Sequence, residues 1–289
     1  MKISTKRKLN NKIKITKIIH RCLIPFILAG IFVIAGCAGT TSTIIPATVP
    51  EVRPGILAGY LPFKAAPNSL TLLPAPPAIG SAAFAADQEA FRTTRSLINT
   101  PRWTQAIKDA VLKFPQAAEA FSCALDAPIT QEITPNIFML LRRSFTDAAI
   151  ATFAAKNHYN RTRPFIINKM TSCTPDEEAE LAKDGSYPSG HTTIGWAWTL
   201  ILAEVAPDRA DAILSRGYAF GQSRVICGVH WQSDVTAGRV LAAGVVAREH
   251  ADPVFRAQIE AAKKELAAVR DKGLKTKNDC PAEAAALSF

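Results

Sequence analysis

Helical patterning beyond residue 82 is the feature that most limits what this chain can fold into. Alternating runs of β-branched residues are nearly absent there, and such runs are what strands require. We therefore expect an all-α, single-domain helical bundle over residues 82–289. Candidate helices lie near residues 83–98, 102–113, 115–124, 135–157, 175–184, 191–205, 208–226, 232–249 and 253–271.

The first 36 residues have the makeup of an export signal. Residues 1–21 contain eight Lys and Arg and no acidic residue, and residues 22–36 are almost wholly apolar. The run ends in Ala35-Gly36-Cys37, which resembles a bacterial lipoprotein signal in which Cys37 is lipidated and becomes the new N-terminus. Ordinary signal cleavage nearby is the alternative. An uncleaved anchor is also conceivable, but the apolar run is short for a spanning helix.

Residues 37–81 are rich in Thr, Pro, Ala and Gly, which predicts a tether followed by an extended arm on the domain. The chain carries a net charge of +10, and the eight basic residues before Cys37 leave about +2 for the mature part. Because most of the positive charge lies in the predicted signal segment, we expect no nucleic-acid partner for the mature protein. The chain after Cys37 has no apolar stretch of about 20 residues, so we expect a soluble protein apart from a membrane-bound lipid.

The mature part contains four cysteines, Cys123, Cys173, Cys227 and Cys280. An even number in an exported protein suggests disulfides, and three connectivities are possible. We expect the pairs Cys123–Cys173 and Cys227–Cys280, with free buried thiols as the alternative.

A His–Asp pair occurs in the segment QSRVICGVHWQSD. His230 and Asp234 are four residues apart, so on a helix they would share a face. An Asp that accepts from one imidazole nitrogen leaves a lone pair on the other, as a nucleophilic or basic His requires. Alone, such a pair is more often a surface contact.

Two further segments combine basic and small polar residues. KNHYNRTRPF places Lys156, Arg161 and Arg163 near the end of a predicted helix, where cations either complement the helix dipole or bind an anion.

In SYPSGHTT, Ser189 and Gly190 precede His191 at a predicted helix start. Ser189 could simply cap the helix, or the exposed N–H groups there could bind an anion with His191 beside it.

Read in order, these segments give Lys156-x6-Arg163-Pro164, then Pro188-Ser189-Gly190-His191, then Ser223-Arg224-x5-His230-x3-Asp234. This pattern resembles the three-part signature of the phosphatidic acid phosphatase type 2 (PAP2) superfamily, which includes bacterial non-specific acid phosphatases and vanadium haloperoxidases. The octapeptide GSYPSGHT, residues 185–192, is further similar to the class A bacterial acid phosphatases. The resemblance covers residues from about 121 to 250.

The resemblance implies a role for each matched residue. His230 would be the nucleophile that forms a phosphohistidine, Asp234 would orient it, and His191 would be the general acid. The residues that would bind the phosphoryl oxygens are Lys156, Arg163, Ser189, Gly190 and Arg224. No metal or cofactor is implied, and related acid phosphatases suggest a homodimer.

We therefore expect an exported, broad-specificity acid phosphatase acting on small phosphomonoesters. It would reside in the periplasm, on the outer membrane as a lipoprotein, or in the envelope or medium if Cys37 is not lipidated. A lipid phosphate or prenyl pyrophosphate phosphatase, a haloperoxidase, a metallophosphatase and a non-catalytic phosphate-binding lipoprotein are the alternatives. The two His roles require opposite protonation states, which predicts a bell-shaped pH dependence with an acidic optimum.

Overall fold

The computed structural model describes residues 45–288, so the predicted signal peptide and Cys37 lie outside the described residues. Its helices and strands, in chain order, are β1 (Glu51–Arg53), β2 (Ile56–Leu57), α1 (Ser69–Leu72), α2 (Ala82–Thr94), α3 (Pro101–Lys108), α4 (Gln116–Glu119), α5 (Ser122–Leu125), α6 (Pro135–Ala151), α7 (Phe153–Tyr159), α8 (Pro164–Ile167), α9 (Glu178–Leu181), α10 (Gly190–Val205), α11 (Ala210–Ile226), α12 (Gln232–Glu249), α13 (Pro253–Asp271) and α14 (Cys280–Leu287). The prediction of an all-α domain is confirmed.

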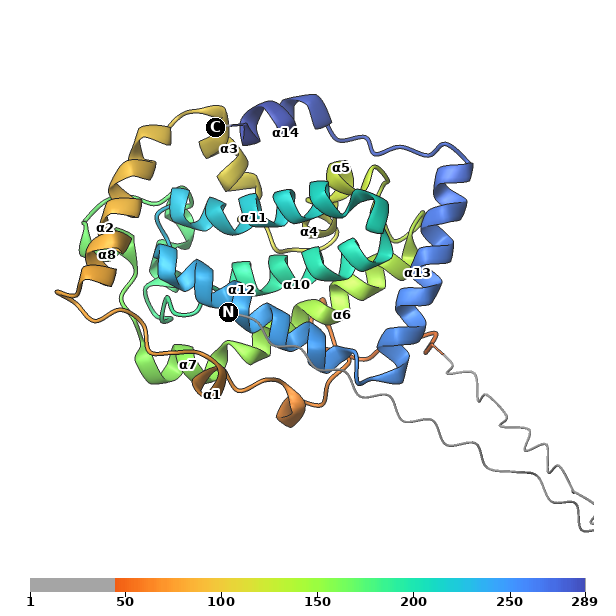
Figure 1. Ribbon diagram of the computed structural model, residues 1–289, viewed down its shortest axis with the longest axis horizontal. Coiled ribbons are helices and arrows are strands. Elements are labelled where there is room, and N and C mark those ends of the chain that lie inside the picture. The colour runs from red at the N-terminus through yellow and green to blue at the C-terminus, as the bar shows by residue number, and fades with distance from the viewer. Residues whose placement is uncertain (1–44, 289) are drawn as a thin grey trace, which may run out of the picture. The chain divides into compact units, whose positions relative to one another are not determined.

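Helix α10 is the centre of the bundle, and α6, α11 and α12 pack around it (Figure 1). Its sequence is apolar on nearly every side, as a helix surrounded by others requires. Trp198 at its middle is fully buried, and the indole N–H donates to the Leu141 carbonyl of α6 at 2.9 Å. The segment GWAW is therefore core, and it fixes the N-terminus of α10 against its neighbours.

The helix boundaries differ from the predicted ones where the chain turns. The predicted helix 135–157 is divided at Thr152 into α6 and α7, and the predicted helix 115–124 consists of the two single turns α4 and α5. Helix α3 ends at Lys108, several residues early, and the short helices α8 and α14 were not predicted.

The arm before α2 is fastened to α6 by hydrogen bonds. Asp147 accepts from the backbone N–H of Tyr60 at 2.7 Å, and Arg143 donates to the Gly59 carbonyl at 2.7 Å. Gly59 has no room for a side chain, because a Cβ there would lie 1.9 Å from Asp147 Oδ1. The strands β1 and β2 pair as a short antiparallel hairpin within this arm.

The predicted disulfide pairing is wrong. The structure joins Cys123 to Cys280 and Cys173 to Cys227, with Cα–Cα distances of 5.4 and 4.6 Å. The loop after α13 returns α14 to the α3 side of the bundle, which brings Cys280 to α5. Cys173 lies beside the end of α11, where its N–H donates to the Cys227 carbonyl at 2.9 Å. These proximities come from tertiary packing, which the spacing of the cysteines does not reveal.

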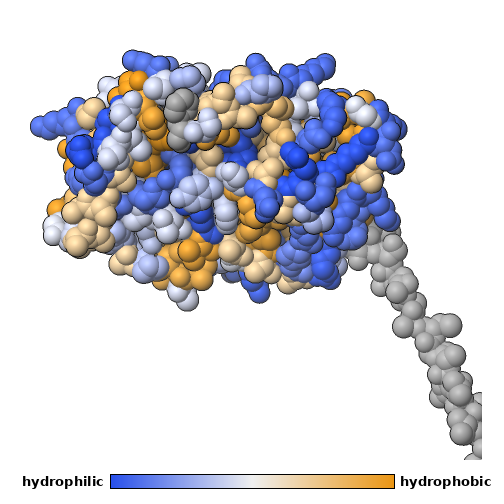
Figure 2. All heavy atoms as spheres, turned by 45° about the horizontal axis from the view of Figure 1, so that its top comes forward, coloured by the Kyte–Doolittle hydropathy of each residue, from blue (hydrophilic) through white to orange (hydrophobic). Residues whose placement is uncertain are grey.

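The face drawn in Figure 2 mixes hydrophilic and hydrophobic side chains. Over residues 45–288, the structure has no helix with the length and apolar character needed to span a bilayer.

Candidate active site

The three sequence segments of the predicted site meet in the structure. The Ser189 N–H donates to the Asp234 carbonyl at 3.0 Å, which joins the start of α10 to α12. The Ser186 N–H donates to the Arg161 carbonyl at 2.8 Å, and Arg163 donates to the Val229 carbonyl at 3.0 Å. Each segment is therefore bonded to both of the others.

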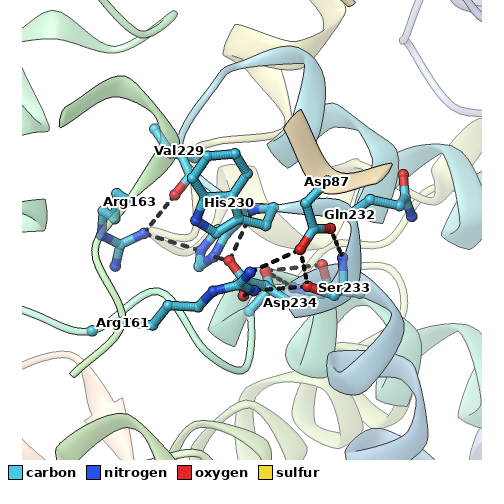
Figure 3. A network of polar contacts seen from close by, with 12 residues as sticks. Asp87, Arg161, Arg163, Val229, His230, Gln232, Ser233 and Asp234 are labelled. Carbon is cyan, nitrogen blue, oxygen red and sulfur yellow. Dashed lines mark hydrogen bonds and ion pairs between the residues drawn. The ribbon is translucent and has the colours of Figure 1, made fainter. Parts of the chain in front are cut away.

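His230 lies in the turn between α11 and α12, and its side chain is buried. The Arg163 guanidinium lies 3.2 Å from His230 Nε2 (Figure 3). Because a guanidinium can only donate, Nε2 must carry the lone pair and Nδ1 the proton of the neutral ring. That tautomer is the one in which Nε2 can act as a nucleophile.

The carboxylate of Asp234 lies beside the other ring nitrogen. Its Oδ2 is 3.5 Å from His230 Nδ1, which makes an electrostatic contact but no hydrogen bond, so Nδ1 has no hydrogen-bond partner among the described residues. The same oxygen accepts from the Trp231 N–H at 2.8 Å, which caps the start of α12. Its Oδ1 is 2.6 Å from Arg161 Nη1. Asp234 is thus in place to orient His230, and it is itself held by Arg161 and Trp231.

The three predicted phosphate-binding cations are all buried. Arg224 is fully buried, and its three guanidinium nitrogens have no hydrogen-bond partner among the described residues. Burial lowers the pKa of Arg224 to about 10. Since buried polar groups are nearly always partnered, these orphan donors indicate a place for an anion.

Lys156 and Arg163 have protein partners in this structure. Lys156 Nζ lies 2.7 Å from Asp184 Oδ2 and 2.5 Å from the Gly185 carbonyl, whereas Arg163 Nε donates to the Leu181 carbonyl at 2.7 Å. Burial lowers the pKa of Lys156 and Arg163, and Asp184 opposes that change. Gly185 must lack a side chain, because a Cβ there would lie 2.8 Å from the Lys156 carbonyl.

Ser189 caps α10 and also retains a free donor. Its Oγ accepts from the Thr192 N–H at 3.3 Å and from the Thr192 hydroxyl at 2.9 Å. A hydroxyl has two acceptor positions and one proton, so the Ser189 proton is left for another group. Gly190 faces Lys156, since a Cβ there would lie 3.9 Å from Lys156 Cε.

His191, at the start of α10, is fixed through one ring nitrogen. Its Nε2 lies 2.9 Å from the Ala110 carbonyl, which can only accept. Nε2 therefore carries a proton, and a proton that His191 gives to a substrate must leave from Nδ1.

The two histidines share one electrostatic environment. Burial lowers the pKa of both rings well below 6.5. The charges of Arg224 and Arg163 lower the pKa of His191 further, and those of Arg163, Lys156 and Arg224 do so for His230. His230 also lowers the pKa of His191, so the two side chains lie within electrostatic reach of each other.

The structure adds residues that the sequence did not assign to the site. Asp87 of α2 accepts from Arg161 at 2.8 Å and from the Ser233 N–H at 2.8 Å (Figure 3). Arg161, which the sequence offered as a possible anion-binding cation, is therefore paired with Asp87 and Asp234. Asp184 was likewise missed, and no local pattern marks it or Asp87.

Across residues 45–288, no group of three or more His, Cys, Asp or Glu side chains is placed to hold a metal ion. The site thus brings together an imidazole with a lone pair, a second imidazole held through one ring nitrogen and one buried guanidinium without a hydrogen-bond partner among residues 45–288, and these groups suit the transfer of a phosphoryl group.

Comparison with known proteins agrees with this class. A family model described as the PAP2 superfamily matches residues 137–255. A non-specific acid phosphatase of Providencia stuartii is 46% identical over 241 residues, covering 81% of this chain and 96% of the relative. An acid phosphatase of Zymomonas mobilis is 42% identical, over 70% of this chain and 77% of the relative. A non-specific acid phosphatase of Salmonella typhimurium is 42% identical, over 69% and 80%.

The chain therefore belongs to the PAP2 superfamily and, within it, to the bacterial non-specific acid phosphatases.

Proposed function

We propose that this protein is an acid phosphatase that hydrolyses small phosphomonoesters of varied structure through a phosphohistidine at His230. The observation that carries the proposal is the 3.2 Å contact between the Arg163 guanidinium and His230 Nε2, which leaves Nε2 with a lone pair, within electrostatic reach of the unpartnered guanidinium of Arg224. The names of the relatives support the activity.

In the first chemical step, His230 Nε2 attacks phosphorus and the bond to the leaving oxygen breaks. The proton on His191 Nδ1 passes to that oxygen, so the alcohol leaves neutral. Asp234 stabilises the Nδ1 proton that His230 keeps. In the second step His191 takes a proton from water, the hydroxide oxygen bonds to phosphorus, and the P–N bond breaks.

The charge on the phosphoryl oxygens is met by donors that the fold has already positioned. Lys156, Arg163 and Arg224 supply positive charge, while Ser189 and the Gly190 backbone supply further hydrogen bonds. Phosphoryl transfer depends mainly on positioning and on such electrostatic stabilisation. The proposal therefore assigns no step to a metal ion or cofactor, and unchanged activity after dialysis against EDTA is the expected result.

The test replaces the nucleophile. His230→Ala is expected to lower kcat with p-nitrophenyl phosphate by at least about 10³-fold, as loss of a catalytic nucleophile does. The wild-type enzyme, quenched during turnover with radiolabelled substrate, should retain acid-labile label on His230. His158→Ala is the matched control, because His158 is exposed. Undiminished hydrolysis by His230→Ala would remove the proposed mechanism.

The substrate class is tested by a panel. Release of phosphate from p-nitrophenyl phosphate and nucleotides should far exceed release from phosphatidic acid micelles. The reverse order would favour a lipid phosphatase. Bromide oxidation in the presence of vanadate would indicate a haloperoxidase.

We also propose that residues 1–36 are a signal peptide, residues 37–81 a tether and arm, and residues 82–289 the phosphatase domain. Lipidation of Cys37 would attach the protein to the outer membrane, where it faces the periplasm. The two disulfides support an oxidising compartment. Labelling with palmitate should be lost in Cys37→Ala, and a wild-type protein without label would sink the lipoprotein assignment. We also propose a homodimer. The molar mass of the protein lacking residues 1–37, measured by light scattering, tests it: a value for one chain would contradict the dimer.

A further inference from the structure

A buried chain of charges lies behind the proposed nucleophile. Arg161 Nη1 is 2.6 Å from Asp234 Oδ1, and Arg161 Nη2 is 2.8 Å from Asp87 Oδ2 (Figure 3). The exposed fractions of these side chains are 9% for Arg161, 3% for Asp87 and none for Asp234. The order is therefore Asp87, Arg161, Asp234, His230, and the first two of these have no role assigned so far.

Asp87 is also fastened to the first turn of α12. Its Oδ1 accepts from the Ser233 N–H at 2.8 Å and its Oδ2 accepts from the Ser233 hydroxyl at 2.6 Å. The Ser233 hydroxyl in turn accepts from Arg161 at 2.7 Å. A carboxylate at a helix N-terminus is favourable, and here it fixes the turn that carries His230 and Asp234.

Arg161 determines how Asp234 acts on His230. Asp234 is the carboxylate beside His230 Nδ1. The other charged groups near the ring are cations from other elements, and His191 of α10 is also close. These cations are Lys156 of α7, Arg163 before α8 and Arg224 of α11. Without Arg161, the Asp234 carboxylate would be buried with no cation bonded to it. Burial raises the pKa of Asp234 and Arg161 lowers it, so without Arg161 the His230–Asp234 pair would bind a proton at higher pH.

We propose that Arg161 and Asp87 are positioning residues of this active site. Arg161 holds the Asp234 carboxylate beside His230 Nδ1 and balances its charge, and Asp87 holds Arg161 and the start of α12. The inference rests on the proposed role of His230 as nucleophile. If His230→Ala is fully active, that role fails regardless of how the Arg161 variants behave.

The experiment compares Arg161→Met with Arg161→Lys in the full-length protein, using p-nitrophenyl phosphate. Arg161→Met is expected to lower kcat by about 10- to 100-fold, as misplacement of a catalytic group does. The acid limb of its kcat/KM profile should move up by about 1 pH unit, because the His230–Asp234 pair binds a proton at higher pH once the Arg161 charge is gone. Arg161→Lys keeps the charge, so it should restore the position of the limb and part of kcat.

A second variant covers the case in which Arg161→Met does not fold. In Asp87→Asn the guanidinium keeps Asp234 as its one carboxylate partner among these residues. We expect a fall in kcat of about 3- to 10-fold, because the start of α12 is less well fixed, with no upward shift of the acid limb. Glu89→Gln and Arg92→Met are matched controls, since this exposed pair lies on the same helix α2.

Two results would overturn the proposal. In the first, the acid limb of Arg161→Met stays at the wild-type pH, and kcat falls only as much as the fraction of folded protein, measured by thermal melting. The other is an Arg161→Lys variant whose limb and kcat match those of Arg161→Met. If neither Arg161 variant folds, wild-type kcat in Asp87→Asn overturns it.

Discussion

The carboxylate of Asp184 lies 2.7 Å from Lys156 Nζ and 3.5 Å from Arg163 Nη2, two of the three cations proposed to bind the phosphoryl group. Its side chain is half exposed, so it has space to move toward solvent. A phosphate that enters the site must share Lys156 with Asp184 or replace it. On the proposed phosphate-binding role of Lys156 and Arg163, Asp184 would compete with substrate and product.

Removal of this charge should tighten the binding of inorganic phosphate. We expect Asp184→Asn to lower the competitive inhibition constant of phosphate by about 3- to 10-fold, since half-exposed ion pairs contribute about 1 kcal/mol. Steady-state inhibition at fixed ionic strength measures it, with the exposed Asp176→Asn as control. Weaker inhibition in Asp184→Asn would mean that Asp184 holds Lys156 in place rather than competing.

The pH dependence follows from the two histidines. Hydrolysis requires His230 neutral and His191 protonated, and burial lowers the pKa of both below 6.5. In the free enzyme, activity should therefore fall as pH rises through the lowered pKa of His191, which puts the basic limb of kcat/KM on the acidic side of neutral. A bound phosphate dianion raises the pKa of His191, so the basic limb of kcat should lie at higher pH.

Profiles of kcat and kcat/KM against pH, measured side by side, test whether the basic limb of kcat lies at higher pH than that of kcat/KM. A kcat/KM that still rises above roughly pH 8 would contradict the assignment of His191 as the acid.

The parts of this site that could be predicted from the sequence are those that local patterns encode. His230 and Asp234 are four residues apart, and Ser189, Gly190 and His191 are adjacent, so spacing and family resemblance both point to them, although His230 lies in the turn before α12 and not on the helix itself. The long helices were predicted for the same reason, because patterning and start signals are local.

The supporting residues could not be predicted in this way. Asp87 is 146 residues from Ser233 and 74 from Arg161, and no rule of spacing connects an acidic residue on one helix to a turn that far along the chain. The disulfide pairing was predicted wrongly for the same reason, because the path of the chain after α13 decides which cysteine lies next to Cys123.

The Cys123–Cys280 bond should stabilise the fold considerably. It closes a loop of 157 residues and ties α14 to the rest of the bundle. Replacement of both cysteines by Ser is expected to lower Tm by roughly 5–15 °C, from a loss of about 2–4 kcal/mol in the free energy of unfolding. Non-reducing peptide mapping should find peptides that link Cys123 to Cys280 and Cys173 to Cys227. Peptides that link Cys123 to Cys173 would contradict the structure.

Two buried carboxyl groups, Asp147 and Glu249, lie beside the arm, and Asp147 bonds to it. Glu249, at the end of α12, is fully buried, and neither of its carboxyl oxygens has a hydrogen-bond partner among the described residues. Its neighbour Asp147 accepts from the Tyr60 N–H. Burial raises the pKa of Asp147 to about 6, and burial together with Asp147 raises that of Glu249 well above 4.5. The folded protein therefore binds protons here that the unfolded chain releases.

This carboxyl pair contributes stability in acid that it loses at neutral pH. Because both carboxyl groups have raised pKa values in the folded state, their contribution is fully present below about pH 4 and is lost as pH rises through the raised values, about 6 for Asp147. The lowered pKa values of His191 and His230 act in the opposite sense below pH 6.5, so the effect of the pair is measured as the Tm of the wild type relative to Glu249→Gln, which should fall between pH 5 and pH 8. Glu249→Gln should flatten that dependence and raise Tm at pH 8 by about 3–6 °C, whereas the exposed Glu260→Gln should change neither. If Glu249→Gln melts with the wild-type pH dependence, the carboxyl pair does not control stability.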